Sequence, residues 1–135
     1  MKTLREEIAG YRSDSNTDEY WARIHEAHPP KELLKAMSEA LSACDEEQCV
    51  SVCNFIRDAV GPFKAEFMAS KLVGQLEELA AGDDVRKANS AVFTLGRLAS
   101  KKSARKLQAV LDGGKHSDHG LLRELRAVIA TLKGA

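Results

Sequence analysis

The chain has 135 residues, of which 44% are hydrophobic, 30% are charged and only 5% are aromatic, as in an ordinary soluble globular protein. A chain of this length can bury a core without disulfide or metal staples, and its apolar runs are too short for a membrane-spanning helix. We therefore expect one domain over residues 1–135, and the dominance of Leu and Ala favours helix over sheet.

The formal net charge is zero, but the charges are unevenly distributed. Residues 1–82 hold 9 Lys and Arg against 15 Asp and Glu, a net charge of −6, and residues 83–135 hold 11 against 5, a net charge of +6. In a chain of stacked repeats, sequence order is also spatial order, so the two ends should differ in electrostatic potential. Chance variation over short windows is the alternative explanation.

Pro, Gly and capping residues divide the chain into about eight predicted helices. Asn16 or Thr17 caps the second helix, Pro30 suits the first turn of the third, and Asp45 with Gln48 forms a capping box that opens the fourth. The predicted helices cover 2–12, a segment from Thr17 to His28, a segment opened by Pro30, 45–60, a segment from Phe63 to Gly82, 84–99, 101–112 and 119–133.

One helical pattern occurs twice in the second half of the chain. The pattern Val85-Arg86-x-Ala88-x-x-Ala91-x-x-x-Leu95 returns 37 positions later as Leu122-Arg123-x-Leu125-x-x-Val128-x-x-x-Leu132. A weaker copy lies 35 positions earlier, with apolar residues at Val50, Cys53 and Val60. A second short helix, Ser103 to Leu111, lies between the two clear copies. A two-helix unit that returns after about 35 to 40 residues is typical of a helical solenoid.

With this pattern the chain resembles the HEAT-like repeat family, in particular the short bacterial kind whose first helix carries an apolar-Arg pair and spaced Ala and Leu. The resemblance is strongest over residues 84–133. It implies an all-α fold, a right-handed α-solenoid of about three to four helical hairpins, in which no hairpin buries its apolar face alone. A four-helix bundle or an irregular all-helical domain is the alternative.

The cysteine and histidine residues favour packing over metal binding. Cys44, Cys49 and Cys53 are odd in number and follow no export signal, which predicts reduced thiols in a cytoplasm. Cys49 and Cys53 share a helix face that needs small apolar groups, and their spacing matches no zinc knuckle. His25 and His28 are three apart, whereas the H-E-x-x-H zinc motif needs four. We expect no metal and no cofactor.

The stretch His116-Ser117-Asp118-His119 contains the residue types of a catalytic triad but not its arrangement. A triad needs groups within hydrogen-bonding reach of one another, normally from separate elements. In this Gly-rich loop, Ser117 or Asp118 is better explained as a helix cap. The sequence therefore predicts no enzyme.

A basic cluster is the candidate site for nucleic acid. It consists of Arg97, Lys101, Lys102, Arg105 and Lys106. Phosphate binding depends on many such charges acting together, and aromatic side chains would stack the bases, but only Phe93 is near. A solvated helix face is the alternative explanation for these charges.

An acidic edge is the candidate site for a protein partner. In a solenoid the turns between hairpins share one edge, and they carry Glu46, Glu47, Glu77 and Glu78. Acids at helix starts are ordinary capping and dipole complements, which explains Glu77 and Glu78 poorly. The resemblance implies a protein-binding module, an immunity protein that neutralises a toxin or a small adaptor. A basic nuclease toxin would match the acidic edge by charge.

Overall fold

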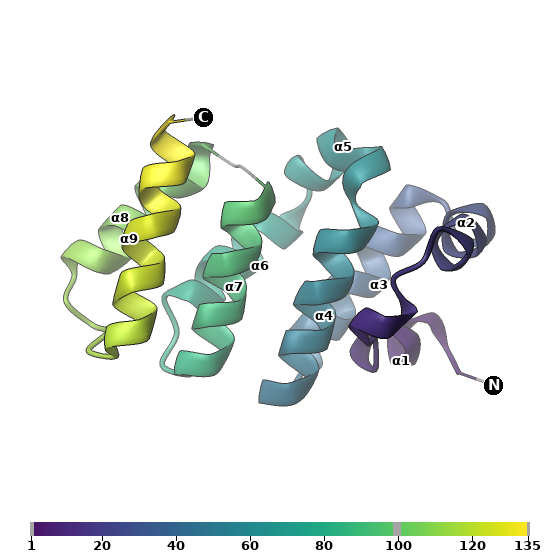
Figure 1. Cartoon of the computed structure of the whole chain (residues 1–135), viewed down its shortest axis with the longest axis horizontal. Coiled ribbons are helices and arrows are strands. Elements are labelled where there is room, and N and C mark those ends of the chain that lie inside the picture. The colour runs from purple at the N-terminus through teal and green to yellow at the C-terminus, as the bar shows by residue number, and fades with distance from the viewer. Residues whose placement is uncertain (1, 99–100, 135) are drawn as a thin grey trace. The chain divides into compact units, whose positions relative to one another are not determined.

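The computed structural model describes residues 2–98 and 101–134, and every regular element in these ranges is helical (Figure 1). The all-α prediction is confirmed. None of the helices in the described ranges has the length and apolar character needed to cross a membrane. The chain divides into two compact units, residues 1–72 and 73–135, which are described separately below.

Unit 1 (residues 1–72) is a helical unit held by α1, α3 and α4. Its α-helices are α1 Leu4–Ala9, α2 Asp18–Ala27, α3 Pro30–Ala43, α4 Glu46–Ala59 and α5 Lys64–Met68, with short 3-10 turns at Ser13–Ser15 and Gly61–Phe63. Helix α1 packs on α3 and α4, and these two pack on each other. The core consists mainly of aliphatic and aromatic side chains that include Ile8, Ile24, Leu33, Met37, Val52, Phe55 and Ile56.

The helix starts of unit 1 follow the sequence signals. The Thr17 hydroxyl accepts a hydrogen bond from the Tyr20 N–H at the start of α2. Asp45 and Gln48 form the predicted reciprocal capping box of α4, and Pro30 occupies the first position of α3. Each device satisfies N–H groups that a helix start leaves without a partner, so the local sequence sets these boundaries.

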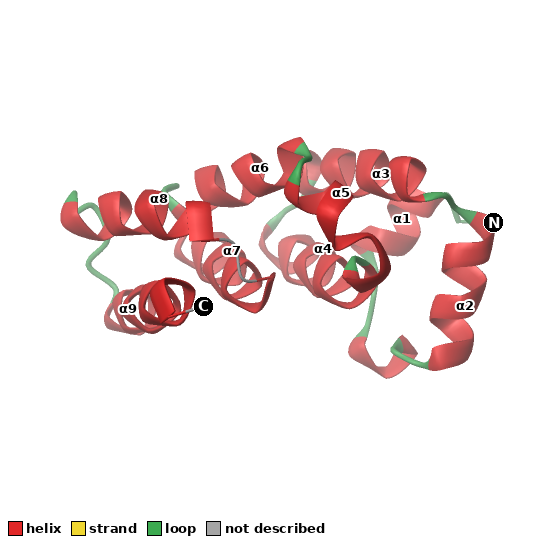
Figure 2. Cartoon of the chain, turned by 90° about the horizontal axis from the view of Figure 1, so that it is seen from above, coloured by secondary structure: helices red, strands yellow, loops and turns green. Residues whose placement is uncertain are grey.

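Within the described residues of unit 2 (residues 73–135), four helices form two layers. They are α6 Lys71–Ala80, which begins just before the unit boundary, α7 Val85–Leu98, α8 Lys101–Asp112 and α9 His119–Gly134. Figure 2 shows α7 and α9 side by side and nearly end-on, with α6 and α8 lying across them. Helix α9 packs against both α7 and α8, so it connects the two layers of this unit.

The predicted helix from Phe63 to Gly82 is wrong as a single element, because it breaks between α5 and α6. At the break the Ser70 hydroxyl donates a hydrogen bond to the Phe67 carbonyl at 2.6 Å and accepts one from the Leu72 N–H at 3.3 Å. A serine hydroxyl that bonds the nearby backbone competes with the helical ladder. The apolar spacing predicts a buried stripe of six residues. The break leaves four of them buried (Phe63, Phe67, Leu72 and Leu76), whereas Met68 and Leu79 are half-buried.

The sequence repeat encodes the packing of α7 and α9. Its last three apolar positions are buried in both copies, at Ala88, Ala91, Leu95, Leu125, Val128 and Leu132. The first position of the repeat is not buried in this way, since the Val85 side chain is 41% exposed. A Cβ atom on Gly96 would lie 2.8 Å from Val128 Cγ2, so glycine at position 96 permits the close approach of the two helices.

Candidate functional site

The basic cluster lies on the outside of unit 2. Arg97 is in the last turn of α7, and Lys101, Lys102, Arg105 and Lys106 occupy the first two turns of α8. All five side chains are exposed, and none hydrogen-bonds or ion-pairs with a residue that the structure describes. Lys101 and Arg105 are four residues apart and share one face of α8, so their like charges repel.

The charges of α8 run against its helix dipole. Its first turn contains Lys101 and Lys102 and no acidic residue, and its last turn contains Asp112 and no basic residue. Cations at a helix start and an anion at its end each cost about 0.3–1 kcal/mol relative to the opposite arrangement. Nothing within unit 2 offsets Lys101 and Lys102 among the described residues. The placement is therefore unfavourable for an isolated copy of the helix.

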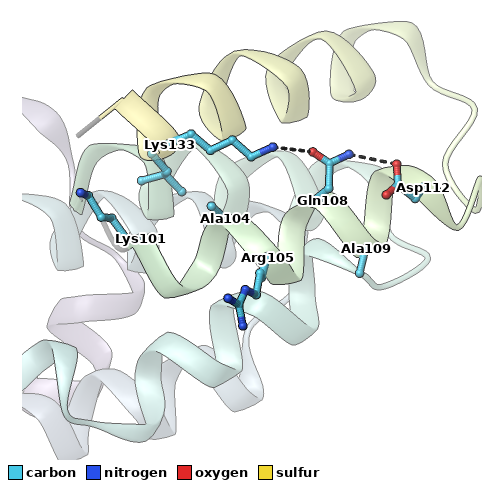
Figure 3. Close-up of a pocket in the computed structure, with 8 residues that line it drawn as sticks. Lys101, Ala104, Arg105, Gln108, Ala109, Asp112 and Lys133 are labelled. Atoms are coloured by element: carbon cyan, nitrogen blue, oxygen red, sulfur yellow. Dashed lines mark hydrogen bonds between the residues drawn. The ribbon is translucent and has the colours of Figure 1, made fainter.

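A groove of about 500 Å³ runs between α8 and the C-terminal turn of α9 (Figure 3). Lys133 Nζ donates to Gln108 Oε1 at 3.2 Å, and Gln108 Nε2 donates to Asp112 Oδ1 at 2.9 Å. Lys101 lies at the other end of α8. The groove is lined by Lys101, Ala104, Arg105, Gln108, Ala109, Asp112, Leu132 and Lys133. Along α8 the groove is cationic at Lys101, apolar at Ala104 and Ala109, and acidic at Asp112.

A second hollow of about 190 Å³ lies between α7 and α9. The Phe93 side chain stands at this hollow and is 41% exposed. Its other lining residues are small, polar or, at Val128, aliphatic: Gly96, Arg97, Glu124, Ala127, Val128 and Thr131. An exposed aromatic ring beside a hollow, with a guanidinium and a carboxylate at its rim, has the composition of a protein-docking surface.

The four predicted acidic residues form two separate pairs. Glu46 and Glu47 are exposed in the first turn of α4, in unit 1, where they complement the helix dipole. In unit 2, Glu78 is exposed and Glu77 is half-buried near the end of α6. The structure describes each pair within its own unit, so a common acidic edge stays a prediction.

The end of α6 is held by the loop between α8 and α9. Lys115 Nζ lies 2.9 Å from the Ala81 carbonyl oxygen and 3.2 Å from the Asp83 carboxylate. The His116 ring is buried, and its Nε2 lies 2.8 Å from the Ala80 carbonyl oxygen. These donors satisfy carbonyl groups that a helix end leaves unpaired.

This geometry accounts for the triad-like stretch without catalysis. Asp118 Oδ1 accepts a hydrogen bond from the Leu121 N–H at 2.9 Å and caps α9, as predicted. His116 is directed to the backbone of α6 rather than to Ser117. Sequence reasoning missed this role of His116, because the bond joins residues that are 36 positions apart.

The three cysteines are all buried, and the core-packing prediction for Cys49 and Cys53 is confirmed at 0% and 1% exposure. Within the described ranges, no group of three or more His, Cys, Asp or Glu side chains is placed to hold a metal ion. Cys44 is also buried, at 8% exposure. Burial of these thiols limits their access to oxidants and electrophiles.

An aromatic cluster in unit 1 contains ionisable groups with perturbed pKa values. Tyr11 packs edge-on against Phe55 and donates a hydrogen bond to Asp58 Oδ2 at 2.7 Å. Burial, together with this bond, raises the pKa of Tyr11. Burial lowers the pKa of His25, which stacks on Trp21. The tyrosine therefore stays protonated and the histidine favours its neutral form, in keeping with a structural role.

Searches of protein-family models, of curated proteins and of solved structures each found no match to this chain. The candidate surfaces therefore depend on the geometry alone. Sequence reasoning missed Gln108, Asp112 and Lys133 as members of the α8–α9 groove. The signal that could have found the first two was the helical spacing from Lys101 to Asp112, which places them on one stripe.

Proposed function

We propose that the chain is a protein-binding helical module, which acts by docking a partner and needs no cofactor. The observation that carries this proposal is the exposed Phe93 ring beside the α7–α9 hollow. Aromatic and Arg side chains dominate binding energy at protein interfaces. Phe93 has Arg97 as its neighbour in the hollow, and Glu124 lies on the facing helix α9.

The size of the hollow favours one anchoring side chain of the partner. A volume of about 190 Å³ is too small for a drug-sized ligand, whose pockets span roughly 300–1,000 Å³. Gly96 and Ala127 leave the space, and Val128 contributes apolar surface. A partner with an apolar side chain, flanked by one acidic and one basic group, would match Val128, Arg97 and Glu124.

Capture of a partner from the native cell lysate, with nuclease treatment and mass spectrometry, tests the proposal. Phe93→Asp should abolish recovery of the partner, because a carboxylate would have to be desolvated at the centre of the interface. Val85→Asp is the matched control, since Val85 is equally exposed on α7 and does not line the hollow. Partner recovery that survives Phe93→Asp would refute this surface.

We further propose that the module is an inhibitor of the immunity-protein kind or a small adaptor, working in the cytoplasm. Support comes from the exposure of Glu46, Glu47 and Glu78 and from the absence of a described ion-pair partner for them. Reversal of Glu46, Glu47, Glu77 and Glu78 to Lys should weaken binding of a basic toxin. Reversal of the exposed Glu26 and Glu39 is the control, and equal affinity in both variants would contradict the acidic-edge proposal.

Nucleic-acid binding is a second candidate function, favoured by the five exposed cations of Arg97, Lys101, Lys102, Arg105 and Lys106. It predicts that affinity for a single-stranded oligonucleotide falls steeply with salt and that charge reversal of the cluster abolishes binding. Reversal of Arg123 and Arg126, exposed on α9, should have a smaller effect. Equal losses of oligonucleotide affinity in the two variants would show that binding depends on net charge and not on this cluster.

We also propose that the helices continue as a HEAT-like right-handed solenoid. The support is the shared burial pattern of α7 and α9, whose last three repeat positions are buried in both helices. A compact globule of this length has a radius of gyration of about 14 Å. Small-angle X-ray scattering should give a larger value for a solenoid, and a value of about 14 Å would contradict it.

A further inference from the structure

A stripe of α8 beside the groove is complementary to itself in the antiparallel direction. Its Lys101, Arg105, Ala109 and Asp112 are exposed, Gln108 is half-buried and Ala104 is buried. The stripe carries Lys101, Ala104, Arg105, Gln108, Ala109 and Asp112. Any helical stripe with this spacing matches its own reversed copy in position. What is particular to α8 is the chemistry of the paired positions: Lys101 would face Asp112, Ala104 would face Ala109, and Arg105 would face Gln108.

We infer that α8 is the contact between two copies of this chain, packed antiparallel about a two-fold axis. Because of the two-fold axis, each pair of facing residues occurs twice in the interface, as in any isologous interface. Two Lys101–Asp112 ion pairs would lie at the ends of the interface. The exposed Ala109 of each copy would lie nearer its centre, beside the largely buried Ala104 of the other copy, and such small side chains let helix axes approach to about 8 Å.

The charge placement along α8 is a second and independent argument for this partner. Lys101 and Lys102 stand at the positive end of their own helix dipole, and Asp112 stands at the negative end. In an antiparallel pair, each of these ends lies beside the opposite end of the second α8. The arrangement that is unfavourable in a single copy therefore becomes favourable in the dimer.

The groove provides room for side chains of a second α8. It measures about 500 Å³ and lies open between α8 and the last turn of α9. Lys101 and Arg105 have no hydrogen bond or ion pair with a described residue, so docking displaces no existing partner of theirs. Gln108 and Asp112 already bond each other at the rim, which holds both side chains on the stripe.

The expected dimer is weak and depends on concentration. Helix α8 has 12 residues and a length of about 18 Å. A contact of this length buries less surface area than a standard protein–protein interface. Residues 73–135 hold 11 Lys and Arg against 7 Asp and Glu, a net charge of +4, so two copies repel at long range. At about 0.15 M salt this repulsion is screened beyond about 8 Å, whereas contact pairs persist.

Sedimentation velocity from about 10 µM to about 1 mM protein tests the inference. We expect a monomer–dimer equilibrium that Lys101→Asp or Asp112→Lys weakens at least about tenfold, because each places two like-charged pairs in the interface. The double variant K101D/D112K should restore the wild-type dissociation constant to within about threefold. Residues 101 and 112 lie three turns apart on one helix, so such rescue requires contact between copies.

Lys102→Asp is the matched control, since it makes the same charge change in the same turn of α8 but off the stripe. It should leave dimerisation within about threefold of wild type. Lys101→Asp and Asp112→Lys both bring the charges of α8 into line with its dipole, so circular dichroism should show undiminished helix content. A chain that stays monomeric to about 1 mM would overturn the inference. Equal effects of Lys101→Asp and Lys102→Asp, or no rescue, would overturn it as well.

Discussion

The contact between α7 and α9 depends on a glycine that helix propensity alone disfavours. Replacing Gly96 with Ala gains about 1 kcal/mol of helix propensity, but the new Cβ would lie 2.8 and 3.1 Å from the two Cγ atoms of Val128. Val128 is buried and β-branched, so it has essentially one side-chain rotamer in a helix. Overpacking of this kind costs about 1–3 kcal/mol. We expect a net loss of up to about 2 kcal/mol in the free energy of unfolding.

Gly74→Ala is the internal comparison for this prediction. Gly74 is exposed on α6, and its Cβ would meet no atom within 4 Å. It should therefore stabilise the chain by up to about 1 kcal/mol. Urea unfolding followed by far-ultraviolet circular dichroism measures both variants. Equal stabilities of Gly96→Ala and Gly74→Ala would refute the close approach of α7 and α9. If the reasoning holds, Val128→Ala should cost less in the Gly96→Ala background than in the wild type.

Three further predictions concern side chains that hold each unit together. Tyr11→Phe removes the hydrogen bond to Asp58 and should lower the free energy of unfolding by about 1 kcal/mol; an unchanged urea midpoint would contradict it. His116→Ala leaves the buried Ala80 carbonyl oxygen without this donor and should cost about 1–3 kcal/mol, whereas alanine at the exposed His119 should cost little. Burial lowers the pKa of His25 in the folded chain, so the unfolded chain binds the proton first. Stability should therefore fall as the pH drops below about 6.5, and His25→Phe should flatten that part of the pH profile measured by urea midpoints.

Local signals in the sequence predicted most of the helix starts and part of the core. The capping residues Thr17, Asp45 and Asp118 perform the predicted roles, because a cap involves neighbours in the chain. The break at Ser70 escaped prediction because the apolar spacing continues through it, and a single hydroxyl decides the outcome. Burial of repeat positions was predictable from their period except at the first position, where Val85 is exposed and Val50 and Leu122 are half-buried.

The candidate surfaces were harder to predict than the helices. The basic residues of α8 were visible as a cluster, but the groove also needs Leu132 and Lys133 from α9. Their proximity follows from the packing of α8 on α9, which no local pattern specifies. The hollow at Phe93 likewise depends on Gly96 and Ala127, whose small size matters only once α7 and α9 lie together.

The natural probes of this chain all lie in unit 1. Trp21, Tyr11 and Tyr20, together with the three buried thiols, lie between residues 11 and 53, and residues 73–135 contain no Trp, Tyr or Cys. Tryptophan fluorescence and thiol labelling therefore report the opening of unit 1 alone, whereas circular dichroism reports both units. If the two units unfold cooperatively, the fluorescence and dichroism transitions will coincide. If they separate, the difference between the two curves isolates the stability of a unit that has no chromophore of its own beyond Phe93 and the peptide bonds.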